Sequence, residues 1–187
     1  MVFEYILKKN GIDPQKDLTI DQSIDFGSTA AAFTGDDSAA YTVEFEPSAT
    51  ILEQEGGGYV VASLGEASGY VPYTSYSAKV SYMEENPEII QKFTNALQKG
   101  MNYVQVHTPE EIAEVIAPQF KETDIETITT IVKRYYDQDT WKENLIFEKD
   151  SFELLQDILE DAGELSQRVN YENLVQPSSA EKASKDK

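Results

Sequence analysis

Ser28 and Thr29 occupy a position where a polar ligand group could bind. They follow a strand-like run and precede residues 30–33, a short run that favours a helix. Ser28 can cap this helix, which would stabilise it by about 1 kcal/mol. The unpaired backbone N–H groups at a helix start can also bind a ligand, and ligands of α/β sheets lie beyond the carboxyl ends of strands. Both interpretations of this pair remain open.

Glu46 is the second candidate, because it ends a strand-like run and directly precedes Pro47. Its carboxylate can complement the dipole of the helix that Pro47 opens. It can equally accept hydrogen bonds from an amine of a bound molecule. The sequence leaves this choice open as well.

Tyr73, Thr74 and Tyr76 form the third group, within the extended stretch 71–78. Tyrosine and threonine are common in strands, so packing alone explains most stretches of this kind. In a cleft, however, tyrosine offers a flat apolar face and a polar tip to a small ring. We therefore include these three residues among the candidate ligand contacts.

The inventory of catalytic side chains is poor. The chain has no cysteine and one histidine, His107, and its arginines are Arg134 and Arg168. The missing thiols exclude disulfides, thiolate catalysis and cysteine-ligated zinc. No glycine-rich phosphate loop precedes a helix with lysine, and no EF-hand spacing occurs. We expect no enzymatic activity, no metal and no cofactor, and we expect Trp141 to be a packing residue.

Charge and length restrict the partners. The 187 residues carry a net charge of −19, and nucleic acids and anionic membrane surfaces bind clustered lysine and arginine, so neither is expected as a partner. No apolar run reaches the length of about 18 residues that a transmembrane helix needs. No signal peptide is recognisable, and Met1 opens directly into an uncapped helix. We therefore expect the chain to begin inside a larger fold.

Strand-like and helix-like runs alternate in the first half of the chain. Residues 2–9 form an apolar-faced helix that Gly11 ends. The predicted strands are residues 17–24, 40–45 and 59–64, and the helices between them are residues 29–35 and 47–52. The triple glycine at residues 56–58 is expected to end the second of these helices. This order favours a mostly parallel sheet. The region from Gly56 to Tyr76 is expected to connect two lobes.

Capped amphipathic helices fill the second half. Asn86 and Pro87 start a long helix, whose expected buried stripe is Ile89, Phe93, Ala96, Leu97, Gly100 and Val104. Capping boxes at residues 108–111 and 123–126 start two more helices. A last helix begins near residue 150 and is expected to end at Gly163. Residues 177–187 lack an apolar anchor and are predicted to be disordered.

Several segments together resemble one protein family. They are Ser28-Thr29-Ala30-Ala31-Ala32-Phe33 with Gly35-Asp36, Phe45-Glu46-Pro47-Ser48-Ala49, Gly58-Tyr59-Val60-Val61-Ala62 and Asn86-Pro87-Glu88-Ile89-Ile90, followed by the helical half. In this order and spacing they resemble the solute-binding proteins of bacterial ABC importers that handle nitrate, sulfonates, taurine and thiamine pyrimidine precursors. The loop at residues 36–40 departs from the usual Gly-Asp pattern of such proteins.

The resemblance implies an α/β, type II periplasmic-binding-protein-like fold with two lobes, here truncated at its N-terminus. Residues 1–72 would form most of the second lobe. Residues 73–176 would form the crossover and the returning, mainly helical half of the first lobe. The implied partners are ABC permease subunits and the implied location is extracytoplasmic. Membrane contact would come only through the permease or a lipid anchor outside this chain.

The charge pattern indicates which ligand to expect. Between Asp17 and Ala78 the chain has many acidic residues and no lysine or arginine, so an anion would bind against a negative field. A neutral or amine-bearing molecule can use Glu46 as an acceptor. We expect a thiamine-pyrimidine-like ring first and an aliphatic sulfonate second. The alternative from another class is a helical interaction or scaffolding domain, which the run of capped helices after Asn86 favours.

Overall fold

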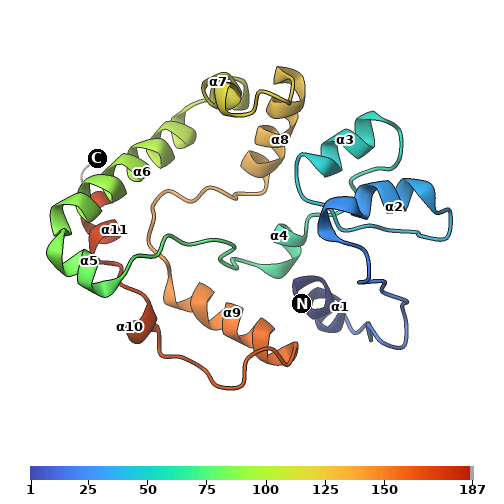
Figure 1. Cartoon of the computed structure of the whole chain (residues 1–187), viewed down its shortest axis with the longest axis horizontal. Helices are drawn as coiled ribbons and strands as arrows, with labels where there is room; N and C mark the ends of the chain where they lie inside the picture. The colour runs from blue at the N-terminus through green and yellow to red at the C-terminus, as the bar shows by residue number, and fades with distance from the viewer. Residues whose placement is uncertain (186–187) are drawn as a thin grey trace. The chain divides into compact units, whose positions relative to one another are not determined.

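Local hydrogen bonds end helix α1 (Val2–Lys9) as the sequence predicts. The computed structural model describes residues 1–185, and Figure 1 shows its elements. Gly11 follows the helix with a positive φ of 76°. Its N–H donates to the carbonyl of Lys8 at 2.9 Å, and Ile12 N–H donates to that of Leu7 at 3.0 Å. This pair of bonds is a Schellman motif, which glycine favours because it lacks a Cβ.

Two further helices end in the same way. Helix α3 (Ser48–Gln54) is followed by Gly56 with φ 74°, and α9 (Lys149–Asp161) by Gly163 with φ 76°. The predictions that the triple glycine and Gly163 end these helices are therefore confirmed. Both helices begin close to their predicted starts, because proline and acidic residues there favour a helix N-terminus.

The chain divides into two compact units. The first comprises residues 1–6, 64–107 and the chain from Asp139 onward; the second comprises residues 7–63 and 108–138. The predicted lobe boundary between residues 72 and 73 stays a prediction. Besides α9, the first unit contains α4 (Leu64–Ser68), α5 (Val80–Glu85), α6 (Pro87–Val106), α10 (Tyr171–Leu174) and α11 (Ser178–Ala183). Besides α3, the second contains η1 (Phe26–Ser28), α2 (Thr29–Gly35), α7 (Pro109–Ile116), η2 (Ala117–Gln119) and α8 (Ile125–Asp137).

Helices α7 and α8 pack together and supply much of the core of the second unit. Their buried apolar side chains are Ile112, Ala113, Ile128 and Val132. The capping box of α7 is confirmed, since Thr108 Oγ1 accepts from Glu111 N–H and Glu111 accepts in return from Thr108 N–H.

The prediction of a capping box at Thr123 is wrong, because Asp124 caps α8. Its Oδ1 accepts from the N–H of Thr127 at 2.9 Å, and its Oδ2 accepts from the Thr127 hydroxyl at 2.7 Å. Asp124 lies one residue closer to the helix, and its two carboxylate oxygens satisfy two donors at once. These hydrogen bonds lower the pKa of Asp124.

The prediction that the apolar stripe of α6 forms its buried face is also wrong. Ile89 and Phe93 are 51% and 47% exposed, whereas Gln98 is 3% exposed. The buried residue of α6 is therefore the amide Gln98, whereas Leu97 and Val104 of the predicted stripe are only half-buried. Side-chain hydrogen bonds make this possible, because Gln98 reaches the main-chain carbonyl of Glu143 at 2.8 Å.

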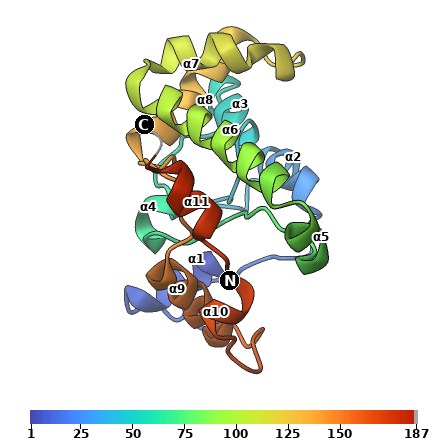
Figure 2. The ribbon, with the colours of Figure 1, turned by 90° about the vertical axis from the view of Figure 1, so that its left-hand side faces the viewer.

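Helix α11 lies along α6, as Figure 2 shows, where the sequence predicts disorder for residues 177–187. Ala180 and Ala183, one turn apart, are 9% and 2% exposed. Gln91 Nε2 donates to the carbonyl of Ser179 at 3.0 Å. The small side chains of these alanines let the two helices approach closely. The segment therefore packs against α6 although it has no large apolar residue. Residues 186 and 187 lie outside the described chain.

No residue between 1 and 185 lies in a β-strand. The four segments predicted to be extended, residues 17–24, 40–45, 59–64 and 71–78, are largely irregular, and α4 begins at Leu64. A strand exists only when a neighbour pairs with its backbone. The two-lobed α/β fold that the resemblance implies is therefore not confirmed by the structure.

Candidate functional site

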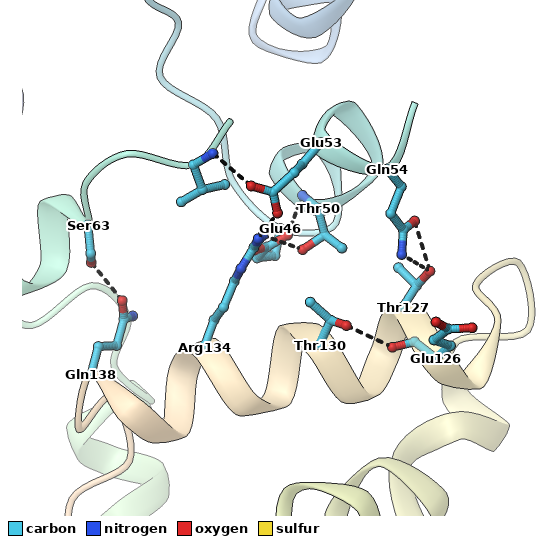
Figure 3. A network of polar contacts seen from close by, with 11 residues as sticks. Glu46, Thr50, Glu53, Gln54, Ser63, Glu126, Thr127, Thr130, Arg134 and Gln138 are labelled. Carbon is cyan, nitrogen blue, oxygen red and sulfur yellow. Dashed lines mark hydrogen bonds and ion pairs between the residues drawn. The ribbon is translucent and has the colours of Figure 1, made fainter. Parts of the chain in front are cut away.

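Glu46 is hydrogen-bonded to Arg134 in the second unit (Figure 3). Arg134 lies on α8, and its Nη1 donates to Glu46 Oε1 at 3.1 Å. The side chains of Glu46 and Arg134 are only 10% and 25% exposed. The carboxylate expected to accept from a ligand amine thus accepts from a guanidinium within the chain.

Glu46 also supports the start of α3. Its Oε2 accepts from the N–H of Thr50 at 3.0 Å, in the first turn of that helix. Thr50 is 1% exposed, and its hydroxyl accepts from Arg134 Nη1 at 2.7 Å. Glu46 therefore stabilises the N-terminus of the helix, as one of the two sequence interpretations proposed.

A second carboxylate contacts the same guanidinium. Glu53 Oε2 accepts from Arg134 Nη2, and Glu53 Oε1 accepts from the N–H of Val60 at 3.1 Å. The hydrogen bond from Val60 lowers the pKa of Glu53, and Arg134 adds to this against the opposing effect of burial. Two carboxylates share one guanidinium, so the cluster carries a net negative charge.

Thr29 contacts another carboxylate that the sequence analysis did not single out. Its hydroxyl lies 3.0 Å from Glu44 Oε2 and 3.1 Å from the carbonyl of Phe26. Glu44 also accepts from the Thr42 hydroxyl at 2.7 Å. Glu44 and Glu46 are two residues apart in an extended run, a spacing that puts them on one side of the chain and could have identified both.

Ser28 is the N-cap residue of α2, but its side chain makes no capping hydrogen bond. The predicted position of the cap is therefore confirmed, whereas the predicted side-chain contribution is not. A role of the backbone N–H groups near Ser28 in ligand binding stays a prediction.

The tyrosine group belongs to the first unit, whereas Ser28, Thr29 and Glu46 belong to the second. Tyr73 and Tyr76 are 80% and 74% exposed, and Thr74 is exposed as well. The ring of Tyr76 packs edge-on against that of Phe93, with ring centroids 5.1 Å apart. The exposed rings retain a face on which a planar ligand could stack.

Arg168 lies in an acidic cluster of the first unit. It donates to three carboxylates on consecutive turns of α9, those of Glu153, Asp157 and Glu160. Arg168 lowers the pKa of Glu160, and Glu160 raises that of Arg168. Both arginines of the chain are thus hydrogen-bonded to carboxylates, which leaves each with less capacity to bind an anionic ligand.

His107 and Trp141, the single histidine and the single tryptophan of the chain, contact neighbouring residues. His107 stacks on Tyr103 with ring centroids 3.6 Å apart, and its Nδ1 lies 2.8 Å from the Tyr103 carbonyl. The main-chain carbonyl of Trp141 accepts from Gln105 at 2.8 Å.

Residues 1–185 contain no group of three or more His, Asp or Glu side chains arranged to hold a metal. Within the same residues, no helix combines the length and apolar character needed to span a bilayer.

Comparison with known proteins identifies the family. A model of the NMT1-like family matches residues 1–118. Over all 187 residues the chain is 40% identical to a protein of Bacillus subtilis (strain 168) named "Putative binding protein YtlA", and it spans 56% of that relative's length. No solved structure matches the chain. The chain therefore belongs to the NMT1-like family, which confirms the resemblance to the solute-binding proteins of the nitrate, sulfonate and thiamine-precursor group.

Proposed function

We propose that this chain is part of an extracytoplasmic solute-binding subunit of an ABC importer, which delivers a small organic molecule to permease subunits. The observation that carries the proposal is the 40% identity, along the entire chain, to a protein whose name describes a binding protein. The family match over residues 1–118 supports the same class. The function is binding and release, without a catalytic step.

The favoured ligand is a neutral or amine-bearing molecule, with a thiamine-pyrimidine-like ring first and an aliphatic sulfonate such as taurine second. The cluster of Glu46, Glu53 and Arg134 supports this choice, because two carboxylates outweigh one guanidinium. A ligand amine can replace one N–H donor of Arg134 at Glu46 without leaving a carboxylate unpaired. An anion would have to compete with both carboxylates for the guanidinium.

Tyr73, Thr74 and Tyr76 are proposed as further ligand contacts. The two tyrosine rings are exposed and could stack on a planar ring, while the Thr74 hydroxyl could donate to a ring nitrogen. Ser28 and Thr29, in the second unit, are proposed as ligand contacts as well. The backbone N–H groups beside them could donate to a polar substituent of the ligand.

A helical interaction domain without a small-molecule ligand is the second candidate. The described residues are organised as helices, and several large apolar side chains on α6 are exposed, with Val106 at 77%. Surfaces of this kind commonly mark protein contacts. The two candidates differ in whether a small molecule binds.

Calorimetry on a chimera separates them. In this chimera the chain replaces the matching part of the Bacillus subtilis relative, so the rest of the family fold is present. An aminopyrimidine is expected to bind at least tenfold more tightly than taurine or nitrate, and Glu46→Gln should weaken it at least tenfold. The control Glu160→Gln alters a carboxylate that faces the other arginine and should leave affinity unchanged.

Two results would contradict the proposal. Preferential binding of nitrate or taurine, unaffected by Glu46→Gln, would reject the ligand class. No binding of any of these solutes by a folded chimera would favour the helical interaction domain.

A further inference from the structure

The outer face of α6, formed by Ile89, Phe93, Ala96 and Gly100, presents an apolar row to solvent. Ile89 and Phe93 are 51% and 47% exposed, and Ala96 and Gly100 are exposed as well. Tyr76, which packs against Phe93, is itself 74% exposed. A Cβ added at Gly100 would meet no atom within 4 Å, so among the described residues no other element lies against this part of the helix.

The spacing of the row is that of a coiled-coil seam. Steps of four, three and four residues separate its members, Ile89, Phe93, Ala96 and Gly100. The same alternation relates the a and d positions of a heptad repeat. Helix α6 has 20 residues and is therefore about 30 Å long. A second helix lying alongside α6 would cover the row.

Lys92 and Lys99 line one edge of the outer face, at the g positions of these heptads. Both are exposed, and neither forms an ion pair with a described residue, whereas Lys133 and Lys149 are paired with carboxylates. The acidic residue of α6 is Glu88, in its first turn. This edge is therefore positive in a chain whose net charge is −19.

The lysines determine which kind of helix fits. In an antiparallel pair g positions face each other, so a second copy of α6 would place lysine against lysine. In a parallel pair g faces e, where α6 has Ile90 and Leu97 and no carboxylate. A helix with glutamates on both sides of its apolar stripe gives each lysine a partner in either direction.

We propose that the outer face of α6 binds an acidic amphipathic helix of another protein. The apolar side chains of that helix pack on Ile89 and Phe93, and its glutamates pair with Lys92 and Lys99. The face lies in the first unit, whereas Glu46, through which the solute proposal is tested, lies in the second. The two proposals can therefore fail independently.

Fluorescence anisotropy tests the proposal with two synthetic helical peptides and the 187-residue chain. Both peptides have leucine at the a and d positions, and one carries glutamate and the other lysine at e and g. The glutamate peptide should bind at least tenfold more tightly at low salt, and added salt should reduce this preference. Attraction to the net negative charge alone would favour the lysine peptide. Equal affinities, or no binding of either peptide, would overturn the proposal.

Charge reversal locates the contact. Lys92→Glu combined with Lys99→Glu should abolish the preference for the glutamate peptide, and it leaves the Phe93 ring in place. Lys9→Glu combined with Lys121→Glu alters two exposed lysines outside α6, changes the net charge by the same amount and should retain the preference. Loss of the preference in both double variants would show a general charge effect and refute the placement.

Two further results would reject the acidic helix as the occupant. A dimer of the chain in analytical ultracentrifugation, which Phe93→Asp dissociates, would show that a second copy covers the face. Binding of the glutamate peptide by the chain but not by the chimera with the Bacillus subtilis relative would show that the rest of the family fold covers it. A monomeric chain and a chimera that both prefer the glutamate peptide would support the proposal.

Discussion

The guanidinium of Arg134 and the carboxylate of Glu46 lie 3.1 Å apart although 88 residues separate them in the chain. This contact joins α8 to the start of α3, and Thr50 and Glu53 on α3 contact the same guanidinium. The cluster is both a structural link within the second unit and the proposed position for a ligand amine. Its contributions to stability and to binding can be measured separately.

Arg134→Met should destabilise the second unit by about 2 kcal/mol, because it leaves the largely buried carboxylate of Glu46 without its charged partner. The matched variant Arg168→Met removes a guanidinium that is 40% exposed and should cost less than about 1 kcal/mol. Urea unfolding followed by circular dichroism measures both. Equal losses would show that burial of the Arg134 cluster contributes nothing.

Acidification should weaken the contact between α3 and α8 through Glu53. The folded-state pKa of Glu53 lies below its ordinary value of 4.5, so this group stabilises the fold above that value. The contribution is lost as the pH falls below about 4.5 and through the lowered pKa. In unfolding measurements between pH 3 and 7, Glu53→Gln should reduce the pH dependence in this window. Glu55→Gln, at an exposed neighbour, should leave it in place.

Gly56→Ala should destabilise the chain by about 1 kcal/mol, because φ is 74° at this position and a Cβ disfavours that conformation. Gly100 lies within α6 and an added Cβ meets no atom within 4 Å. Gly100→Ala should therefore stabilise the chain by about 0.5–1 kcal/mol. Thermal unfolding of the two variants should show midpoint shifts of opposite sign, and shifts of the same sign would contradict the assignment of Gly56 as the C′ residue.

Asp124→Ala should cost about 1 kcal/mol, because it removes the acceptor for the N–H and the hydroxyl of Thr127 at the start of α8. Thr123→Ala should change stability by less than about 0.3 kcal/mol, since the cap does not use this side chain. Denaturant unfolding of both variants distinguishes the observed cap from the one that the sequence predicted. A larger loss at Thr123 would favour the latter.

Local sequence by itself determined where most helices start and stop. The Schellman ends at Gly11, Gly56 and Gly163 and the capping box at Thr108 depend on residues within one helical turn. Such interactions need no distant partner, so spacing and residue type were sufficient to predict them. The family could also be inferred from the order of short segments.

Only the tertiary structure decided which faces are buried and which charges are paired. The burial of Gln98 on α6 depends on the Glu143 carbonyl, and the helix of residues 178–183 depends on its packing against α6. Glu46 accepts a hydrogen bond from Arg134, which lies 88 residues further along the chain. The predicted strands remained unpaired for a related reason, because a strand needs a neighbouring backbone and its own sequence does not supply one.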